Sequence, residues 1–208
     1  MKDDQMSRHR YFQLNTCYLK DYDLGLINDP PDKVRHVDFM LMWGERMGEL
    51  YPSDRMDACI FLDPDYGMKL SGLMSNTCRH LIVSTPIKEV IRTAFVDPRA
   101  VEIFPVAIYD QKKRLADDGY FYINPIGTVD CLDQRLSVIK RTEEGEVISV
   151  KKKVLDARSI DPAVKLFRPK EAPSSYIIRH DLLMTIKDLN LPIPNIYVDE
   201  LEVTGDAP

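Results

Sequence analysis

Two carboxylates, Asp130 and Asp133, are the pair in this chain whose spacing could support acid and base catalysis. Hydrolases that use paired carboxylates need one group as the acid and the other as the base. In an alternating strand, however, residues three apart point to opposite faces of the sheet. The spacing therefore favours a structural role, in which these carboxylates accept hydrogen bonds from backbone in a turn or at a sheet edge.

A calcium loop is a second candidate, because Asp57, Asp63 and Asp65 resemble its opening residues. Such a loop also requires a glutamate at its end, and none follows Gly67 at the required position. The segment from Asp63 to Gly67 is better interpreted as a turn, since it combines aspartate, proline and glycine.

The cysteine and histidine residues give little support to a metal site or a catalytic site. Cys78 and His80 could supply two metal ligands, but a zinc site needs three or four and no second pair lies at a usable spacing. His180 beside Asp181 could suggest a proton relay, yet we expect Asp181 to cap a helix and His180 to lie exposed next to it. We therefore predict no catalytic residue, no cofactor and no metal site.

The elements that would position such residues are clearest in two segments, 81–108 and 176–203. An offset of 95 positions brings their apolar residues into register, from Leu81 on Tyr176 to Ile103 on Val198. Each segment reads as a buried strand, an amphipathic helix and a second strand. Both a duplication and a coincidence of two common units remain open.

Helix boundaries follow from local chemistry. In the first unit, Ser84 and Thr85 can accept from the free amides of the first turn, and Pro86 suits a position that needs no donor. Asp97 and Pro98 end that helix. In the second unit the same reasoning makes Asp181 the cap.

The chain has 208 residues, of which 44% are hydrophobic, and this composition is typical of a globular protein. It contains no apolar run long enough to span a membrane, and its first residues lack the apolar core of a signal peptide. Its four cysteines are widely spaced, as expected of reduced thiols. We therefore expect a cytoplasmic protein without a membrane partner.

The net charge of −5 is concentrated near the N-terminus. Residues 1–75 hold thirteen acidic and nine basic residues, whereas the rest of the chain holds twenty and nineteen. An acidic chain is a poor ligand for phosphates, which argues against nucleic acid as the main partner.

We predict an α+β fold, with a mixed or antiparallel sheet and a few helices packed on it, including the two strand-helix-strand units. A division into a variable part, residues 1–75, and a region of residues 76–208 is expected, and the two could pack as one domain. Trp43, the sole tryptophan, is expected in the core.

Several motifs in the second region occur in a recognisable order: "LIVSTPIKEVI", "VEIFPVAIYD", "GYFYINPIGTVDCLDQRLS", "KLFRP" and "YIIRHDLLMTIKDL". Over about residues 76–203 the chain resembles the eleventh immunity-protein family of bacterial polymorphic toxin systems. Ser84, the Phe104-Pro105-Val106 segment, and Asp130 with Asp133 match the family pattern. No resemblance is found in residues 1–75.

That resemblance implies a protein that binds and neutralises a cognate toxin encoded nearby, by surface complementarity and without catalysis. The contacts are expected on exposed loops that carry acids and tyrosines. The candidates are Asp63, Asp65, Tyr66, Asp117, Asp118 and Tyr120.

Two other functions remain as alternatives. A carboxylate-dependent hydrolase would join acids from distant segments in a deep pocket. An adaptor of a secretion system, or a homo-oligomeric subunit, would instead present a large apolar patch.

Overall fold

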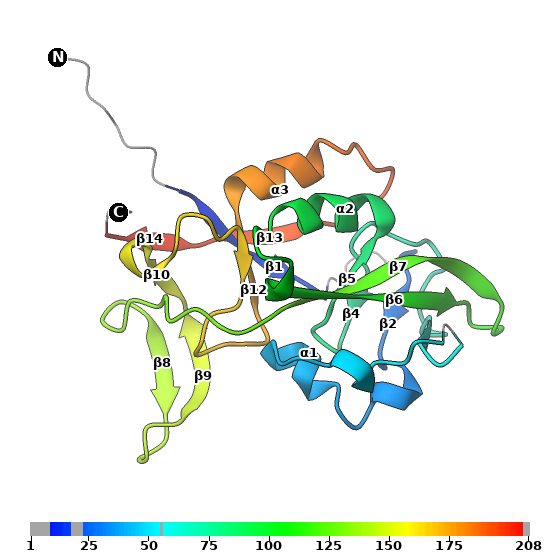
Figure 1. Cartoon of the computed structure of the whole chain (residues 1–208), viewed down its shortest axis with the longest axis horizontal. Coiled ribbons are helices and arrows are strands. Elements are labelled where there is room, and N and C mark those ends of the chain that lie inside the picture. Colours follow the sequence, from blue (N-terminus) through cyan, green and yellow to red (C-terminus); the bar gives the residue numbers. More distant parts are fainter. Residues whose placement is uncertain (1–8, 18–22, 55, 206–208) are drawn as a thin grey trace.

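A computed structural model describes residues 9–17, 23–54 and 56–205 (Figure 1). The three α-helices of this part are α1 (Phe39–Trp43), α2 (Thr85–Thr93) and α3 (His180–Lys187). The strands up to the first hairpin are β1 (Tyr11–Asn15), β2 (Leu26–Ile27), β3 (Cys59–Phe61), β4 (Ser75–Asn76), β5 (Leu81–Ser84), β6 (Val101–Tyr109) and β7 (Leu115–Pro125). The later strands are β8 (Val138–Arg141), β9 (Val147–Lys152), β10 (Val154–Asp156), β11 (Leu166–Phe167), β12 (Tyr176–Arg179), β13 (Tyr197–Glu200) and β14 (Glu202–Thr204). The predicted α+β class is confirmed.

Two four-stranded sheets form the framework, with the orders β3-β6-β7-β5 and β11-β12-β1-β13. In the first sheet β7 is antiparallel to both β5 and β6, and β3 is parallel to β6. In the second, β1 is antiparallel to β12 and β13. Segments from the first 75 residues thus contribute a strand to each sheet: β3 at an edge of one, and β1 inside the other.

The two strand-helix-strand units have the same topology. The offset of 95 residues carries β5 onto β12 at both ends, and it carries the first residue of α2 onto that of α3. In each unit the two strands are parallel but not adjacent, because one antiparallel strand lies between them: β7 in the first unit and β1 in the second. The predicted elements of both units are confirmed.

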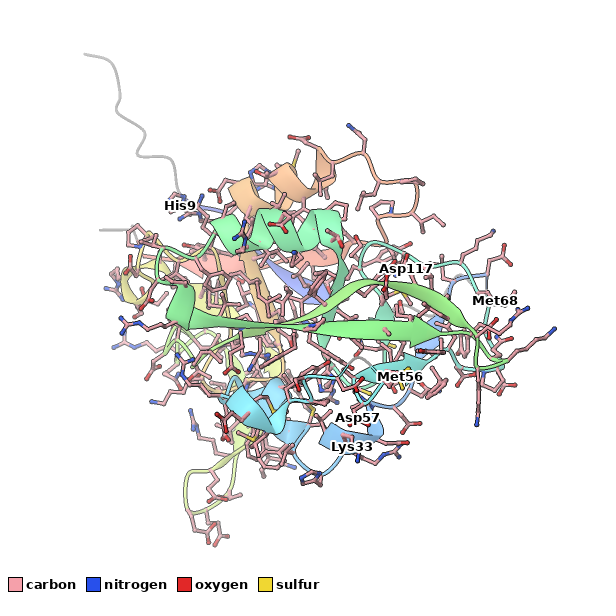
Figure 2. All side chains as sticks on the ribbon, turned by 45° about the vertical axis from the view of Figure 1, so that its right-hand side comes forward. His9, Lys33, Met56, Asp57, Met68 and Asp117 are labelled. Carbon is pink, nitrogen blue, oxygen red and sulfur yellow. The ribbon has the colours of Figure 1, made fainter. Side chains whose placement is uncertain are left out.

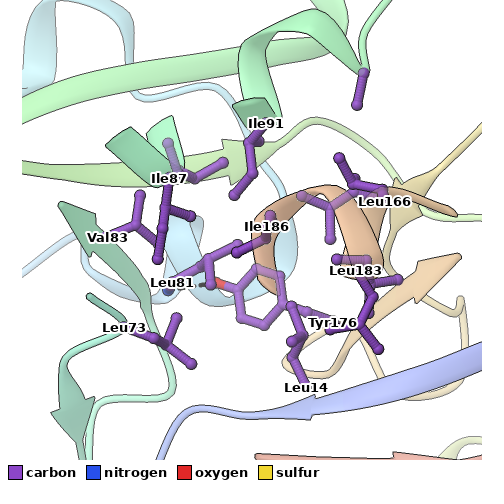
Figure 3. Close-up of a cluster of buried hydrophobic side chains, with 14 of the residues drawn as sticks. Leu14, Leu73, Leu81, Val83, Ile87, Ile91, Leu166, Tyr176, Leu183 and Ile186 are labelled. Carbon is purple, nitrogen blue, oxygen red and sulfur yellow. Dashed lines mark hydrogen bonds between the residues drawn. The ribbon is translucent and has the colours of Figure 1, made fainter. Parts of the chain in front are cut away.

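Helices α2 and α3 share one hydrophobic core with the buried faces of both sheets (Figure 3). Ile87 and Ile91 of α2 meet Leu183 and Ile186 of α3 in this cluster. At its base the amide of Leu81 donates to the hydroxyl of Tyr176 at 3.1 Å, so two residues that the offset equates touch each other. Burial of this common face explains why both units show the same apolar periodicity.

The predicted helix caps are wrong in both units. The hydroxyl of Ser84 makes no capping hydrogen bond, and that of Thr85 donates to the carbonyl of Gly119 at 2.9 Å. Asp181 lies inside the first turn of α3, where Arg179 donates to both of its carboxylate oxygens. His180 begins the helix half-buried, with its ring centroid 5.9 Å from that of Phe12. The hydroxyl of Ser84 is buried without a partner among the described residues, although Ser84 occupies the N-cap position.

The opposite face of the first sheet packs on the N-terminal segment, which includes α1 (Figure 1). Val34, Leu41, Met47 and Tyr51 meet the sheet residue Tyr122 in this second core.

No helix in the described part of the chain is long and apolar enough to cross a membrane.

Arg168 lies at the junction of the two sheets and α1, and it is fully buried. Its guanidinium donates to the carbonyls of Leu41 at 2.5 Å and Met42 at 2.9 Å, which belong to α1. It also donates to the carbonyls of Pro125 and Pro173 and to the hydroxyl of Tyr176. Backbone from three separate segments therefore depends on one side chain.

Gly44 ends α1 next to this junction. Its φ of +72° is a left-handed conformation, and a Cβ there would lie 2.8 Å from the carbonyl oxygen of Pro125. Glycine is thus required both by the backbone conformation and by the close approach of α1 to the end of β7.

We expect Arg168→Met to lower the free energy of unfolding by about 3 kcal/mol or more, because several buried carbonyls would lose their donor at once. Arg158→Met, at an exposed arginine paired with Asp156, should change stability by about 0.5 kcal/mol at most. Urea unfolding of both variants measures the difference. Equal effects would show that Arg168 does not hold the junction.

The side chain of His80 is also buried, and burial lowers its pKa to about 4. Neither ring nitrogen has a hydrogen-bond partner among the described residues, and the ring packs edge-on against Tyr122. The backbone of Asp38 favours the charged form slightly, and the charge of Arg168 opposes it.

Stability should therefore fall as the pH falls from about 6.5, where an unfolded histidine binds its proton, towards 4. We expect wild type to lose roughly 2 kcal/mol more than His80→Phe between pH 6.5 and 5. Unfolding at both pH values tests this, with exposed His36→Gln as the control. Parallel pH curves for wild type and His80→Phe would contradict the buried, neutral state of His80.

Candidate partner-binding surface

The paired carboxylates considered for catalysis have separate structural roles. Asp133 accepts from the amides of Arg135 at 2.9 Å and Leu136 at 3.2 Å, and these bonds with that of Thr204 hold its pKa below the usual range. Asp130 forms an exposed ion pair with Lys170 at 2.9 Å. The turn role is confirmed for Asp133, which lies in a loop that precedes β8.

The side chains of Cys78 and His80 each have a separate environment. The thiol of Cys78 donates to the carbonyl of Asn28, and His80 is enclosed in the core. In the part of the chain that the structure describes, no group of three or more potential ligands gathers around one point.

The predicted turn from Asp63 to Gly67 is present at the end of β3. The carboxylate of Asp63 accepts from the amide of Asp65 at 2.7 Å and from the side chain of Asn28. Gln111, at the tip of the hairpin between β6 and β7, donates to the carbonyls of Asp63 and Tyr66 at 3.1 and 2.7 Å. The turn and the hairpin tip are thereby joined.

The other three candidates lie on a strand and not in a loop, which corrects the prediction. Asp117 and Asp118 are exposed on β7, which begins at Leu115. Tyr120 is only 4% exposed, and its hydroxyl donates to the carbonyl of Ser71 at 2.9 Å. Strand β7 continues through these polar residues, since Asp117 pairs with Ile108 of β6. The register of the two strands is irregular at this pair. Tyr120 is part of the core.

A hollow of about 610 Å³, the β3 groove, lies beside the turn. One wall is β3 with its flanking residues, and the other is the segment 28–35. The hollow is lined by Asn28, Asp29, Pro30, Asp32, Lys33, Arg35, Met56, Asp57, Cys59, Ile60, Phe61, Leu62, Asp63, Pro64 and Lys113. Met56, Asp57 and Lys33 lie on the same side of the molecule (Figure 2). Of the six predicted contact residues, Asp63 is the one that lines the groove.

An exposed apolar row borders this groove. Phe61 of β3 pairs with Tyr109 of β6, and Tyr109 pairs with Leu115 of β7, so the three side chains share one face of the sheet. Phe61 is 42% exposed and Leu115 is 55% exposed. Met56, 65% exposed, contacts the Tyr109 hydroxyl through its sulfur at 3.3 Å. Aromatic residues and methionine in such a cluster are typical of interface cores.

Charges of both signs surround the row. Arg35 pairs with Asp29 at 3.2 Å and with Asp32 at 2.9 Å, which leaves these acids neutralised within the protein. The exposed carboxylate of Asp57, by contrast, makes no ion pair with any residue that the structure describes. Asp57 and Asp63 therefore stand at the two ends of β3 as the acids best placed to meet a partner.

Trp43 is half exposed, at 50%, and not in the core as we predicted. It stacks edge-on against Phe39, with ring centroids 5.4 Å apart. Leu41 between them points into the core instead, since a helix as short as α1 buries only one side.

A second hollow, of about 320 Å³, lies below the end of α2 and has mostly apolar walls. Its acids are already engaged: Asp97 accepts from the amide of Arg99, and Asp161 accepts from that of Ala163. None of the predicted contact residues lines it.

No pattern in the amino-acid sequence predicts the apolar row. Residues 58–62 are all apolar, so alternation could not show that Phe61 faces solvent while Ile60 is buried. Tyr109 and Leu115 become neighbours only through the pairing of β6 with β7.

A comparison with protein families matches residues 41–194 to the Immunity protein family (Imm11). This chain belongs to that immunity family. The match begins in α1, earlier than the resemblance at residue 76, and therefore includes β3. The expectation that nothing before residue 76 resembles the family is thus wrong for residues 41–75. No curated protein matches the chain.

Proposed function

We propose that this protein acts in the bacterial cytoplasm as the immunity protein of a polymorphic toxin system, protecting against a toxin encoded nearby. It binds that toxin through the β3 groove and the adjoining apolar row. Membership of the immunity family is the observation that carries the proposal. Met56, Phe61, Tyr109 and Leu115 supply an exposed apolar centre with charges at its rim, as in other protein interfaces.

Asp57 and Asp63 of the acidic N-terminal third line the groove and support this location, whereas Asp29 and Asp32 there are paired with Arg35. Unpaired carboxylates favour a partner with basic groups at matching positions and speed its association. The predicted contacts Asp65, Tyr66, Asp117 and Asp118 belong to the same end of the sheet, and we retain them as outer contacts.

Catalysis is not required for this role, and the groove favours binding. Its acids come from distant segments, as a hydrolase would need, but Asp29 and Asp32 pair with Arg35 and Asp63 is held in its turn. Three of the four acids that line the groove are therefore engaged within the protein itself.

An adaptor of a secretion system is the competing interaction role. It would also bind an effector, but it would leave the effector active. Loss of toxin activity upon binding therefore distinguishes the two roles.

Titration of the toxin with this protein tests the proposal. The toxin is taken as the product of the neighbouring gene that arrests growth when expressed alone. We expect co-expression to restore growth and the purified protein to abolish toxin activity at an equimolar ratio, because a tight complex inhibits by occupancy.

Three outcomes would contradict the proposal. No rescue and no complex would exclude immunity. A complex that leaves the toxin active would indicate an adaptor. Complete, time-dependent inactivation at a small fraction of the toxin concentration would indicate an enzyme.

A further inference from the structure

Strand β3 is an edge strand, and its ladder shows which of its backbone groups face outwards. The amide of Ala107 donates to the carbonyl of Ala58 at 3.2 Å, and the amide of Leu62 donates to that of Tyr109 at 2.9 Å. Residues 58, 60 and 62 therefore bond to β6. Because backbone groups alternate along a strand, the amides of Cys59 and Phe61 point to the opposite edge.

That edge is open over these residues. Among the described residues, no hydrogen-bond acceptor meets the amide of Cys59 or of Phe61. Beyond Phe61 the edge is closed, since the amide of Asp63 donates to the carbonyl of Leu26 at 2.8 Å and Leu62 forms a bridge with Ile27. The open stretch coincides with the β3 groove.

The other edge of the same sheet is protected. Along β5, the amide of Met74 donates to the carbonyl of Ile82 at 2.9 Å, and that of Ser84 donates to the carbonyl of Gly72 at 2.8 Å. Natural sheets cover or charge their edges to prevent unwanted pairing. The uncovered edge of β3 beside exposed Phe61 and Met56 therefore indicates a site at which a further strand pairs with the sheet.

We infer that the partner contributes an extended segment, which pairs with Cys59 to Phe61 as an added outer strand of the first sheet. This inference rests on the proposed function and specifies how the toxin is recognised. In strand addition, main-chain hydrogen bonds hold the segment and alternate side chains give specificity.

The side chains of the groove define the chemistry of this segment. On the face that carries Phe61 and Tyr109, the added strand places an apolar side chain beside the row. At its ends, Asp57 and Asp63 favour lysine or arginine. The partner is thus a short extended peptide stretch with an apolar centre and basic flanks.

Amide hydrogen exchange, followed residue by residue in the full chain, tests this pairing. The probe is the toxin identified by rescue and co-purification, inactivated by mutation. In the free protein the amide of Ile60 should exchange slowly and those of Cys59 and Phe61 rapidly. On complex formation, we expect exchange at Cys59 and Phe61 to slow by at least tenfold, because new hydrogen bonds protect these amides.

Proline at the outward-facing position gives a second readout. Cys59→Pro removes an amide that β6 does not use, so the fold is retained, and proline is tolerated on such an edge. We expect it to weaken toxin binding at least tenfold more than Cys59→Val, which keeps the amide. Thermal unfolding confirms that both variants are folded.

A complex in which both amides keep their free exchange rates would overturn strand addition while leaving the immunity function intact. So would equal affinities of the two folded Cys59 variants. Protection of these amides in the toxin-free protein, rising with its concentration, would identify a second copy as the occupant and also overturn the inference. Absence of any toxin complex would instead contradict the proposed function itself.

Discussion

The guanidinium of Arg168 is a positive charge enclosed in the protein and satisfied mainly by backbone carbonyls. A buried charge is costly unless all of its donors are used. Here the carbonyls come from α1, the end of β7 and the segment before β12, so those elements must stay together for the charge to be satisfied. The ring of Tyr176 lies 4.2 Å from the guanidinium and adds a cation–π contact.

This constraint extends to the segment that follows α1. Asn124 accepts from Arg168 and donates to Glu102, whose carboxylate accepts from the amides of Met47 and Gly48. The N-terminal segment is thereby held against the first sheet in the second half of α1 and just after it. Residues 28–35, which form the outer wall of the β3 groove, precede this anchored segment in the chain.

The predictions that succeeded depended on local periodicity. The two strand-helix-strand units could be recognised because each buries one face, and they match at the offset of 95 residues because α2 and α3 share one core. The predictions that failed depended on tertiary neighbours. Asp181 is taken by Arg179, Tyr120 reaches Ser71, and Trp43 lies on the open side of α1. No pattern within a single element reports such contacts.

The candidate site was predicted only in part. The turn at Asp63 was recognisable from its aspartate, proline and glycine residues, and it lies beside the groove. The groove itself joins residues 28–35 to β3 and to the β6–β7 hairpin, and that juxtaposition is created by strand pairing. Arg168 likewise appeared only as part of "KLFRP", because a buried arginine cannot be distinguished from an exposed one by its sequence context alone.

The central claim is that the toxin binds at the β3 groove, and the affinity of the purified toxin for two matched variants tests it most directly. Phe61→Asp places a charge in the apolar row, whereas Ile148→Asp places one on another exposed apolar residue, in β9. We expect Phe61→Asp to raise the dissociation constant by roughly thirtyfold or more, as for a central interface residue, and Ile148→Asp to leave it unchanged. Wild-type affinity for Phe61→Asp, or a larger loss for Ile148→Asp, would contradict this location of the binding surface.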